Sequence, residues 1–311
     1  MFRGTLAGSL LLALVGGAMP MTATAGVVAA PAFAGPNEDC VASAARLVFL
    51  RDLGPPIGFE IFTVRPNGTG LKRLTDNLVE EWGPTWSPDG TKIVFSSHRD
   101  GNGEIYVMDR TGLNVTRLTK NDASDSVPAW SPDGSKIAFS SSRDDPMDID
   151  HDLFVMDADG GNVTKVVGSP RTEQNPSWSP NSRRIVFDRD DSIFTVRSDG
   201  TDLEKLTSRR RMLASSPSWS HHGRRIVFQA QSSEEKRMDV LVMKRDGTNK
   251  RPLISTKKEE QSPTWSANDS RIAFTNNWRV AVARADGSRR VTLFRHDLAD
   301  YTVDWGSAVS C

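Results

Sequence analysis

The stretch Pro-Ala-Trp-Ser-Pro-Asp-Gly, at Pro128–Gly134, decides the fold because it recurs along nearly the whole chain. The copy at Pro84–Gly90 differs from it at one position, and shorter copies follow at 176–181, 217–220 and 263–266. A remnant, Val303–Gly306, lies near the C-terminus. The copies place six tryptophans 40 to 48 residues apart: Trp86, Trp130, Trp178, Trp219, Trp265 and Trp305. A period in this range predicts a repeat architecture.

The unit that starts at Pro84 shows what each repeat contains. We expect a short strand at 84–86, with proline as its first residue, and a turn at Ser87–Gly90. An apolar second strand at 92–96, a third strand at 104–109 and a polar fourth strand at 115–119 follow. In later units an Asp-Gly pair marks the hairpin after the third strand. No segment has a sustained helical period, so the sequence predicts an all-β fold and gives little support to α/β or α+β classes.

The first unit has no tryptophan strand. Residues 47–50, 60–64 and 72–75 supply three strands, and the missing one is found at the other end of the chain, at Thr302–Trp305. If the C-terminal strand completes the first blade, a row of sheets closes into a ring without exposed edges. The sequence therefore predicts a six-bladed β-propeller of four-stranded antiparallel blades, closed in this way.

The repeat pattern resembles a known family. Pro-x-Trp-Ser-Pro-Asp-Gly-x-Lys-Ile-Ala-Phe, followed by Arg-Asp, a strand ending in Val-Met-Asp and a glycine hairpin, is similar to the WD40-like (PD40) repeats of TolB-type six-bladed propellers. The resemblance covers residues 46–306. It implies a six-bladed propeller, but the α/β domain that precedes the propeller in TolB, and the hydrolase domain of the similar prolyl oligopeptidases, are not expected here.

The N-terminal segment is typical of a secretory signal peptide. Arg3 is followed by an apolar run over Leu6–Ala18, which is shorter than the ~20 residues that cross a bilayer, and then by small residues. Cleavage after Ala25 or after Ala34 fits the small-x-small rule, and we prefer Ala34. The expected organisation is a signal peptide at 1–34, a short lead at 35–45 and the propeller at 46–311. The expected location is extracellular, periplasmic or in the cell envelope.

The chain has two cysteines, Cys40 and Cys311. In an exported protein such a pair usually forms a disulfide, which here would tie the two ends of the propeller together. The alternative is two unpaired thiols.

A search for chemistry finds no Gly-x-Ser-x-Gly, His-Glu-x-x-His, phosphate loop or Cys-x-x-Cys in the sequence. The histidines fall at unlike repeat positions, which favours loop histidines over the metal-binding histidines of the similar oligogalacturonate lyases: His98, His151, His221, His222 and His296. Asp148, Asp150 and Asp152 alternate in an acidic insertion. They suit either a solvated loop or a Ca²⁺ site, and we prefer the loop.

Charge is balanced, with 39 Lys and Arg against 39 Asp and Glu, so no nucleic-acid partner is expected. The basic residues at 209–211 and 257–258 are interpreted as solvated loops. The repeated tryptophans are interpreted as core between blades, whereas Trp82 and Trp278 lie outside that series and are candidates for an exposed rim.

These observations favour a secreted, monomeric, non-catalytic binding or scaffold propeller without a cofactor or membrane span. It would recognise a protein, peptide or glycan through loops at one face. Two alternatives stay open. One is a metal-assisted polysaccharide lyase or hydrolase with its site at the channel mouth, and the other is a structural part of the cell envelope.

Overall fold

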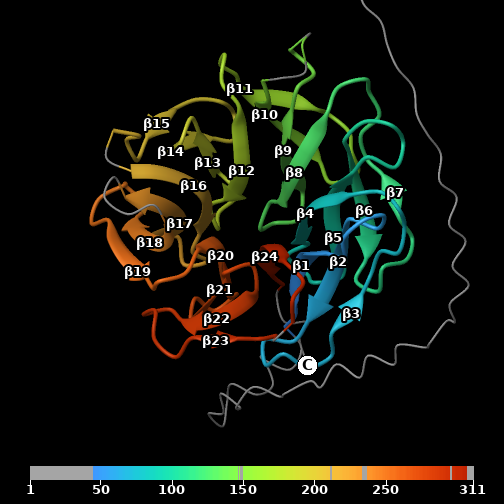
Figure 1. Cartoon of the computed structure of the whole chain (residues 1–311). Coiled ribbons are helices and arrows are strands. Elements are labelled where there is room, and N and C mark those ends of the chain that lie inside the picture. Colours follow the sequence, from blue (N-terminus) through green and yellow to red (C-terminus); the bar gives the residue numbers. More distant parts are fainter. Residues whose placement is uncertain are drawn as a thin grey trace, which may run out of the picture.

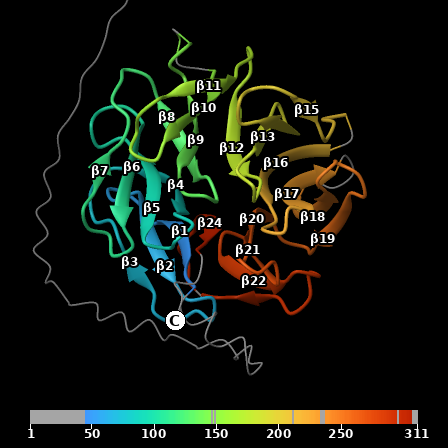
Figure 2. The ribbon, with the colours of Figure 1, turned by 180° about the vertical axis from the view of Figure 1, so that it is seen from behind.

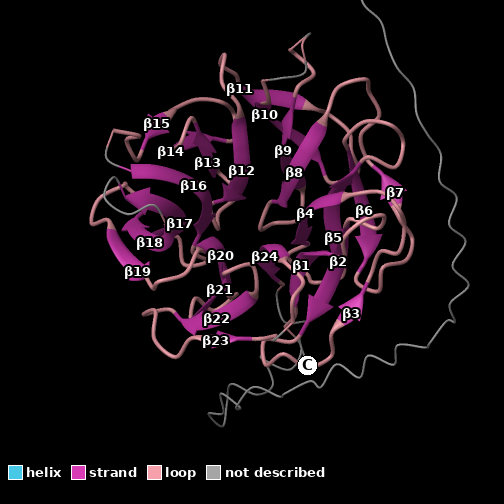
Figure 3. Ribbon diagram, in the orientation of Figure 1, coloured by secondary structure: helices cyan, strands magenta, loops and turns pink. Residues whose placement is uncertain are grey.

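The computed structural model describes residues 45–145, 147, 150–210, 212–232, 237–294 and 296–306. In these residues the regular secondary structure is entirely β-strand (Figure 3). The strands form six four-stranded sheets, arranged as blades around a central axis (Figure 1). The predicted all-β six-bladed propeller is therefore confirmed.

Each blade runs from an innermost first strand to an outermost fourth strand. Blade 1 contains β24 (Asp300–Trp305), β1 (Leu47–Asp52), β2 (Phe59–Val64) and β3 (Lys72–Arg73). Blade 2 contains β4 (Glu81–Trp86), β5 (Lys92–Ser97), β6 (Glu104–Asp109) and β7 (Thr116–Arg117). Blade 3 contains β8 (Asp125–Trp130), β9 (Lys136–Ser141), β10 (Asp152–Asp157) and β11 (Thr164–Val167).

The other three blades repeat this order. Blade 4 contains β12 (Glu173–Trp178), β13 (Arg184–Arg189), β14 (Ser192–Arg197) and β15 (Glu204–Lys205). Blade 5 contains β16 (Met212–Trp219), β17 (Arg225–Ser232), β18 (Met238–Lys244) and β19 (Arg251–Ile254). Blade 6 contains β20 (Glu260–Trp265), β21 (Arg271–Asn276), β22 (Val280–Arg284) and β23 (Val291–Thr292). The first strands surround the axis in both views (Figure 2).

Blade 1 closes the ring as the sequence predicts. The C-terminal strand β24 pairs antiparallel with β1, from Leu47 opposite Trp305 to Arg51 opposite Asp300. The backbone N–H of Gly306 also donates to the carbonyl of Arg46, over 2.9 Å. The two ends of the described chain therefore lie side by side.

The repeat proline does not begin its strand, and this expectation was wrong. β4 starts at Glu81, so Pro84 is its fourth residue. The register between β4 and β5 shifts between Trp82 and Thr85, and Gly83 in this bulge has φ +54°. Because a bulge interrupts the ladder, the missing proline N–H leaves no regular hydrogen bond unmade.

Antiparallel strands give the ring two different faces. First strands begin, and second strands end, at the face that we call the loop face. It carries the connections between second and third strands and the connections between blades. The opposite turn face carries the Ser-Pro-Asp-Gly turns and the glycine hairpins.

The second strand of each blade is the core of the molecule. Phe95 of β5 and its counterparts are fully buried: Phe49, Phe139, Phe187, Phe228 and Phe274. The core clusters join adjacent blades, so that Trp86 of blade 2 packs with Val48 and Leu50 of blade 1. Burial of an aromatic side chain of this size contributes about 1.5 to 3 kcal/mol. Stability therefore comes from contacts between blades as much as within them.

Candidate functional site

A cavity of about 400 Å³ lies on the axis, and the repeat motif itself lines it. The lining includes the Pro-x-Trp-Ser segments of the first strands and turn residues such as Pro88, Pro132 and Pro180. Five of the six repeat tryptophans are at least 93% buried, and Trp130 is half-buried. The interpretation of these tryptophans as core between blades agrees with this burial, although their edges also form the channel wall.

Two rings of unlike residues face this cavity. The first ring holds the residue before each repeat proline: Gly83, Val127, Asn175, Ser216, Ser262 and Thr302. All six have positive φ, between +31° and +54°. The second ring holds the residue after that proline: Thr85, Ala129, Ser177, Ser218, Thr264 and Asp304. The side chains in both rings are small and uncharged, except for that of Asp304.

Asp304 fastens the closing strand to its neighbours. Its carboxylate accepts a hydrogen bond from the backbone N–H of Trp86, over 2.9 Å, and one from the Thr264 hydroxyl, over 3.3 Å. Burial deep in the ring raises the pKa of this carboxyl group, and the Trp86 N–H opposes the shift. Asp304 therefore joins blades 6, 1 and 2 at the channel wall.

Asp188 lies behind the first ring. Its Oδ1 accepts hydrogen bonds from the Asn175 side chain, over 2.9 Å, and from the backbone N–H of Ser216, over 2.8 Å. Burial raises the pKa of Asp188 to about 7, and these donors offset only part of that rise. The carboxyl group joins blade 4 to blade 5.

The histidines do not come together. His98, His151 and His296 lie in three different connections of the loop face, whereas His221 and His222 lie in a turn of blade 5. Asp269 of blade 6 lies 2.6 Å from Nδ1 of His222 and 3.5 Å from Nδ1 of His221. Although burial opposes it, hydrogen bonding to His221 and His222 holds the pKa of Asp269 well below its usual range. In the part of the chain that the structure describes, no three His, Cys, Asp or Glu side chains are grouped so as to hold a metal ion.

A lysine forms ion pairs with carboxylates of the acidic insertion. Nζ of Lys165 lies 2.5 Å from Asp152 and 3.0 Å from Asp144. A calcium ion at these carboxylates would have to displace this ammonium group. Asp148 lies outside the described residues, and Asp150 lies within them. The preference for a solvated loop over a Ca²⁺ site remains a prediction, and the position of Lys165 supports it.

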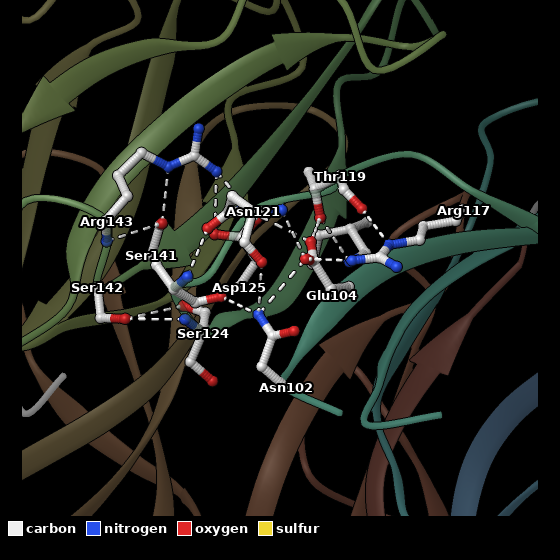
Figure 4. A network of polar contacts seen from close by, with 12 residues as sticks. Asn102, Glu104, Arg117, Thr119, Asn121, Ser124, Asp125, Ser141, Ser142 and Arg143 are labelled. Carbon is white, nitrogen blue, oxygen red and sulfur yellow. Dashed lines mark hydrogen bonds and ion pairs between the residues drawn. The ribbon is translucent and has the colours of Figure 1, made fainter. Parts of the chain in front are cut away.

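Buried carboxylates hold the connections of the loop face in place through hydrogen bonds from arginine side chains. Glu104 accepts a hydrogen bond from Arg117, over 2.6 Å, and Asp125 accepts two from Arg143, over 2.9 and 3.0 Å (Figure 4). Asn121 joins the two groups because its side chain donates to Asp125 and its backbone to Glu104. These charges are therefore engaged within the fold.

An aromatic row crosses the loop face where the ring closes. The ring centroids of Trp278 and Tyr301 lie 5.1 Å apart, those of Tyr301 and Phe59 lie 5.2 Å apart, and those of Phe59 and Trp82 lie 4.6 Å apart. The row therefore runs from blade 6 through blade 1 to blade 2. Trp278 is 40% exposed and the other three side chains are half-buried. The predicted rim residues Trp82 and Trp278 are the two ends of this row.

Sequence reasoning missed the middle of the row, and one signal could have found it. Tyr301 stands two residues before Val303, which takes the place of the repeat proline, as Trp82 stands two residues before Pro84. Aligning the repeats on the proline puts both aromatic residues in one position of adjacent blades. Phe59 gives no such signal, because it meets them only through the pairing of β1 with β2 and β24.

Other predicted features are placed as follows. Cys40, Cys311 and the N-terminal segment lie outside the described residues, as does Arg211. Arg209 forms ion pairs with Asp190 and Asp191, and Lys257 and Lys258 are exposed, which agrees with solvated loops. Among the residues that the structure describes, there is no helix of the length and hydrophobicity needed to span a membrane.

Comparison with known proteins agrees with this architecture. The family model described as the TolB beta propeller domain matches residues 121–307, and the model of the Tricorn protease N-terminal beta propeller domain matches residues 57–181. A curated relative, the protein TolB homolog of Chlorobium luteolum, is 40% identical over 50 residues, which are 16% of this chain and 12% of that protein.

Two solved structures share the fold. TolB from Acinetobacter baumannii superposes with a TM-score of 0.71 at 18% identity, over 84% of this chain and 66% of that chain. A putative TolB from Agrobacterium tumefaciens superposes with a TM-score of 0.66 at 18% identity, over 84% of this chain and 98% of that chain. This chain thus matches slightly less than two thirds of the Acinetobacter protein and a small part of the curated relative.

Proposed function

The chain belongs to the family of TolB beta propeller domains, and from this premise we propose that it is a non-catalytic binding propeller that holds a protein, peptide or glycan at its loop face. The observation that carries the proposal is the aromatic row of Trp278, Tyr301, Phe59 and Trp82. Tryptophan and tyrosine supply large contact areas with little loss of side-chain freedom, and they are enriched at binding surfaces.

The turn face is a weaker candidate because its residues are engaged in the fold. The backbone N–H of Asp133 donates to the hydroxyl of Ser182 in the next blade, over 3.2 Å. A Cβ atom on Gly112 would lie 2.5 Å from the carbonyl oxygen of Leu74 in the preceding blade. Such turns are held close to their neighbours, whereas the loop face is built of segments of unlike length and sequence.

The proposal includes export and a monomeric state. The charged start, apolar run and small residues of the N-terminal segment support export to the envelope or the medium. Two cysteines near the ends of the chain fit an oxidising compartment. The balanced charge supports a partner that is neither nucleic acid nor another polyanion.

The metal-assisted alternative gains little from the geometry. The two histidines that do come close together, His221 and His222, share one carboxylate, Asp269, whose hydrogen bonds hold adjacent turns together. Among the residues that the structure describes, no group of three His, Cys, Asp or Glu side chains offers a set of metal ligands, and we propose no reaction.

Two variants at exposed residues on opposite faces of the ring test the binding face. Trp278→Ala removes the exposed end of the aromatic row, and Leu113→Ala removes a side chain of the turn face that is 65% exposed. We expect the purified protein to bind a subset of a glycan and peptide array, with signals reduced at least about tenfold by Trp278→Ala and unchanged by Leu113→Ala. Signals that survive Trp278→Ala, or a blank array, would count against the loop face.

A further inference from the structure

We propose that the aromatic row binds an extended, proline-rich peptide segment with a basic residue at one end. This inference rests on the proposed function, since it names the ligand class of the same surface. Three properties of the row carry it: the tilt of successive rings, the hydrogen-bonding character of their free polar groups, and the charges that lie beside it.

Successive rings of the row contact each other at steep angles and do not form a flat platform. The interplanar angles are 46° between Trp278 and Tyr301, 87° between Tyr301 and Phe59, and 48° between Phe59 and Trp82. A pyranose ring stacks best on an open, flat aromatic face. A polyproline II segment instead packs its compact pyrrolidine rings along a surface lined by aromatic side chains, which need not be coplanar.

The length of the row agrees with a short segment of this kind. From the first centroid to the last, the row is no longer than about 15 Å. A polyproline II helix rises ~3.1 Å per residue, so about five residues would span it. Such a segment is already extended before binding, and little conformational entropy is lost when it docks.

Each free polar group of the row can donate a hydrogen bond at neutral pH. In the described part of the chain, no acceptor pairs with the Tyr301 hydroxyl or with the indole N–H of Trp82 or Trp278. Burial, and then the charge of Asp52, raises the pKa of the Tyr301 hydroxyl, so it stays protonated. A proline-rich segment lacks most of its backbone N–H groups but keeps its carbonyls, which are the acceptors that these donors need.

Charge gives the segment a direction. Asp52 acts on the hydroxyl of Tyr301, and the exposed Glu80 lies against Gly58, where an added Cβ would meet its side chain at 3.3 Å. Both carboxylates flank the part of the row nearest Phe59. Arg279 follows Trp278 at the other end and is half-buried. A basic residue of the ligand would therefore lie toward Trp82 and away from Trp278.

The probes for this proposal are two decaproline peptides, one ending in arginine and one ending in glutamate. The purified full chain is titrated with each, and binding is followed by tryptophan fluorescence and by calorimetry. We expect saturable binding of the arginine peptide, at least about fivefold tighter than the glutamate peptide, with a preference that shrinks in high salt.

Three variants assign the binding to the row. Trp278→Ala is expected to weaken the arginine peptide at least about tenfold, and Tyr301→Phe about threefold, because it keeps the packed ring and removes only the hydroxyl donor. Leu113→Ala on the turn face should leave binding unchanged. Circular dichroism and the melting temperature show whether each variant remains folded.

The outcomes separate this inference from the proposed function. No saturable binding of either peptide, or binding that Trp278→Ala and Tyr301→Phe leave unchanged, overturns the proline-rich ligand. If a glycan or a proline-free peptide binds instead, and Trp278→Ala abolishes that binding, the loop face stands as the binding surface while the ligand class proposed here is wrong.

Discussion

Single residues show how the channel wall is built under strain. The residue before each repeat proline adopts positive φ, and at Val127 this is a β-branched residue at +44°. Such side chains rarely take this conformation, which costs roughly 1–2 kcal/mol relative to glycine. In the preceding blade the equivalent residue is Gly83, where an added Cβ would lie 3.0 Å from Cα of Val127. In this first ring of channel residues, a side chain larger than glycine therefore fits only where the neighbouring blade leaves room for its Cβ.

Asp188 gives a prediction at this scale. In the unfolded chain its pKa is about 3.9, and in the folded protein it is about 7. Its contribution to stability is therefore fully present below about pH 4 and is lost as the pH rises to about 7, because ionisation then opposes burial. Asp188→Asn keeps the Oδ1 acceptor and does not ionise. We expect the variant to equal the wild type at pH 4 and to be more stable by roughly 2–4 kcal/mol at pH 8.

Urea unfolding at pH 4, 6 and 8 measures this difference. Asp122→Asn, which removes an equal charge from an exposed side chain, is the matched control. A difference between Asp188→Asn and the wild type that does not change with pH would show that Asp188 is ionised in the folded protein at neutral pH.

At the scale of the strand, an ion pair between an arginine and a buried carboxylate links a first strand to the second strand of its blade. In blade 1, Nε of Arg51 on β1 lies 2.7 Å from Asp300 on β24, and the two side chains are 5% and 0% exposed. The Arg51 guanidinium also lies over the rings of Phe49, Phe62 and Phe294. Blade 5 has Ala214 opposite Ala230 at the corresponding place. The fold therefore accepts an apolar pair in place of the buried ion pair.

This comparison predicts strong coupling between Arg51 and Asp300. Arg51→Ala or Asp300→Ala leaves one buried charge without its partner, and each should cost about 3–5 kcal/mol. The double variant resembles blade 5 and should lose less than the sum of the single losses, with a coupling of about 2 kcal/mol or more.

A double-mutant cycle by urea unfolding tests this coupling. The control cycle uses Lys136 and Asp157, which form an ion pair of 2.8 Å between β9 and β10 with side chains 44% and 33% exposed. For such a pair we expect about 0.2–1 kcal/mol. A coupling between Arg51 and Asp300 no larger than this would contradict the interpretation.

At the scale of the whole molecule, the repeat explains why the architecture could be predicted and the candidate site could not. Trp86 and its five counterparts fix the period, and the displaced strand at Trp305 fixes the closure, so blade number and ring topology follow from spacing alone. The aromatic row depends on which residues the loops of three blades bring together. Trp82 and Trp278 stand out in the sequence, but their connection through Phe59 and Tyr301 requires the ring to be closed first.

Ring closure also gives the last prediction. Arg46 and Gly306 are joined by a backbone hydrogen bond, Cys40 lies six residues before Arg46, and Cys311 lies five residues after Gly306. Since an extended chain spans up to about 3.6 Å per residue, the two cysteines can meet, and we expect them to form a disulfide in an oxidising compartment. Its removal should cost about 2–5 kcal/mol, because the crosslink restricts the unfolded chain and prevents β24 from leaving β1.

Cys40→Ser, Cys311→Ser and the double variant should therefore lose equal stability in urea without reductant, and with reductant all three should match the wild type. The intact mass of the unreduced protein should be lower by two hydrogen atoms than that of the reduced protein. Two titratable thiols in the unreduced protein, or single variants as stable as the wild type, would mean that strand pairing alone holds the ring closed.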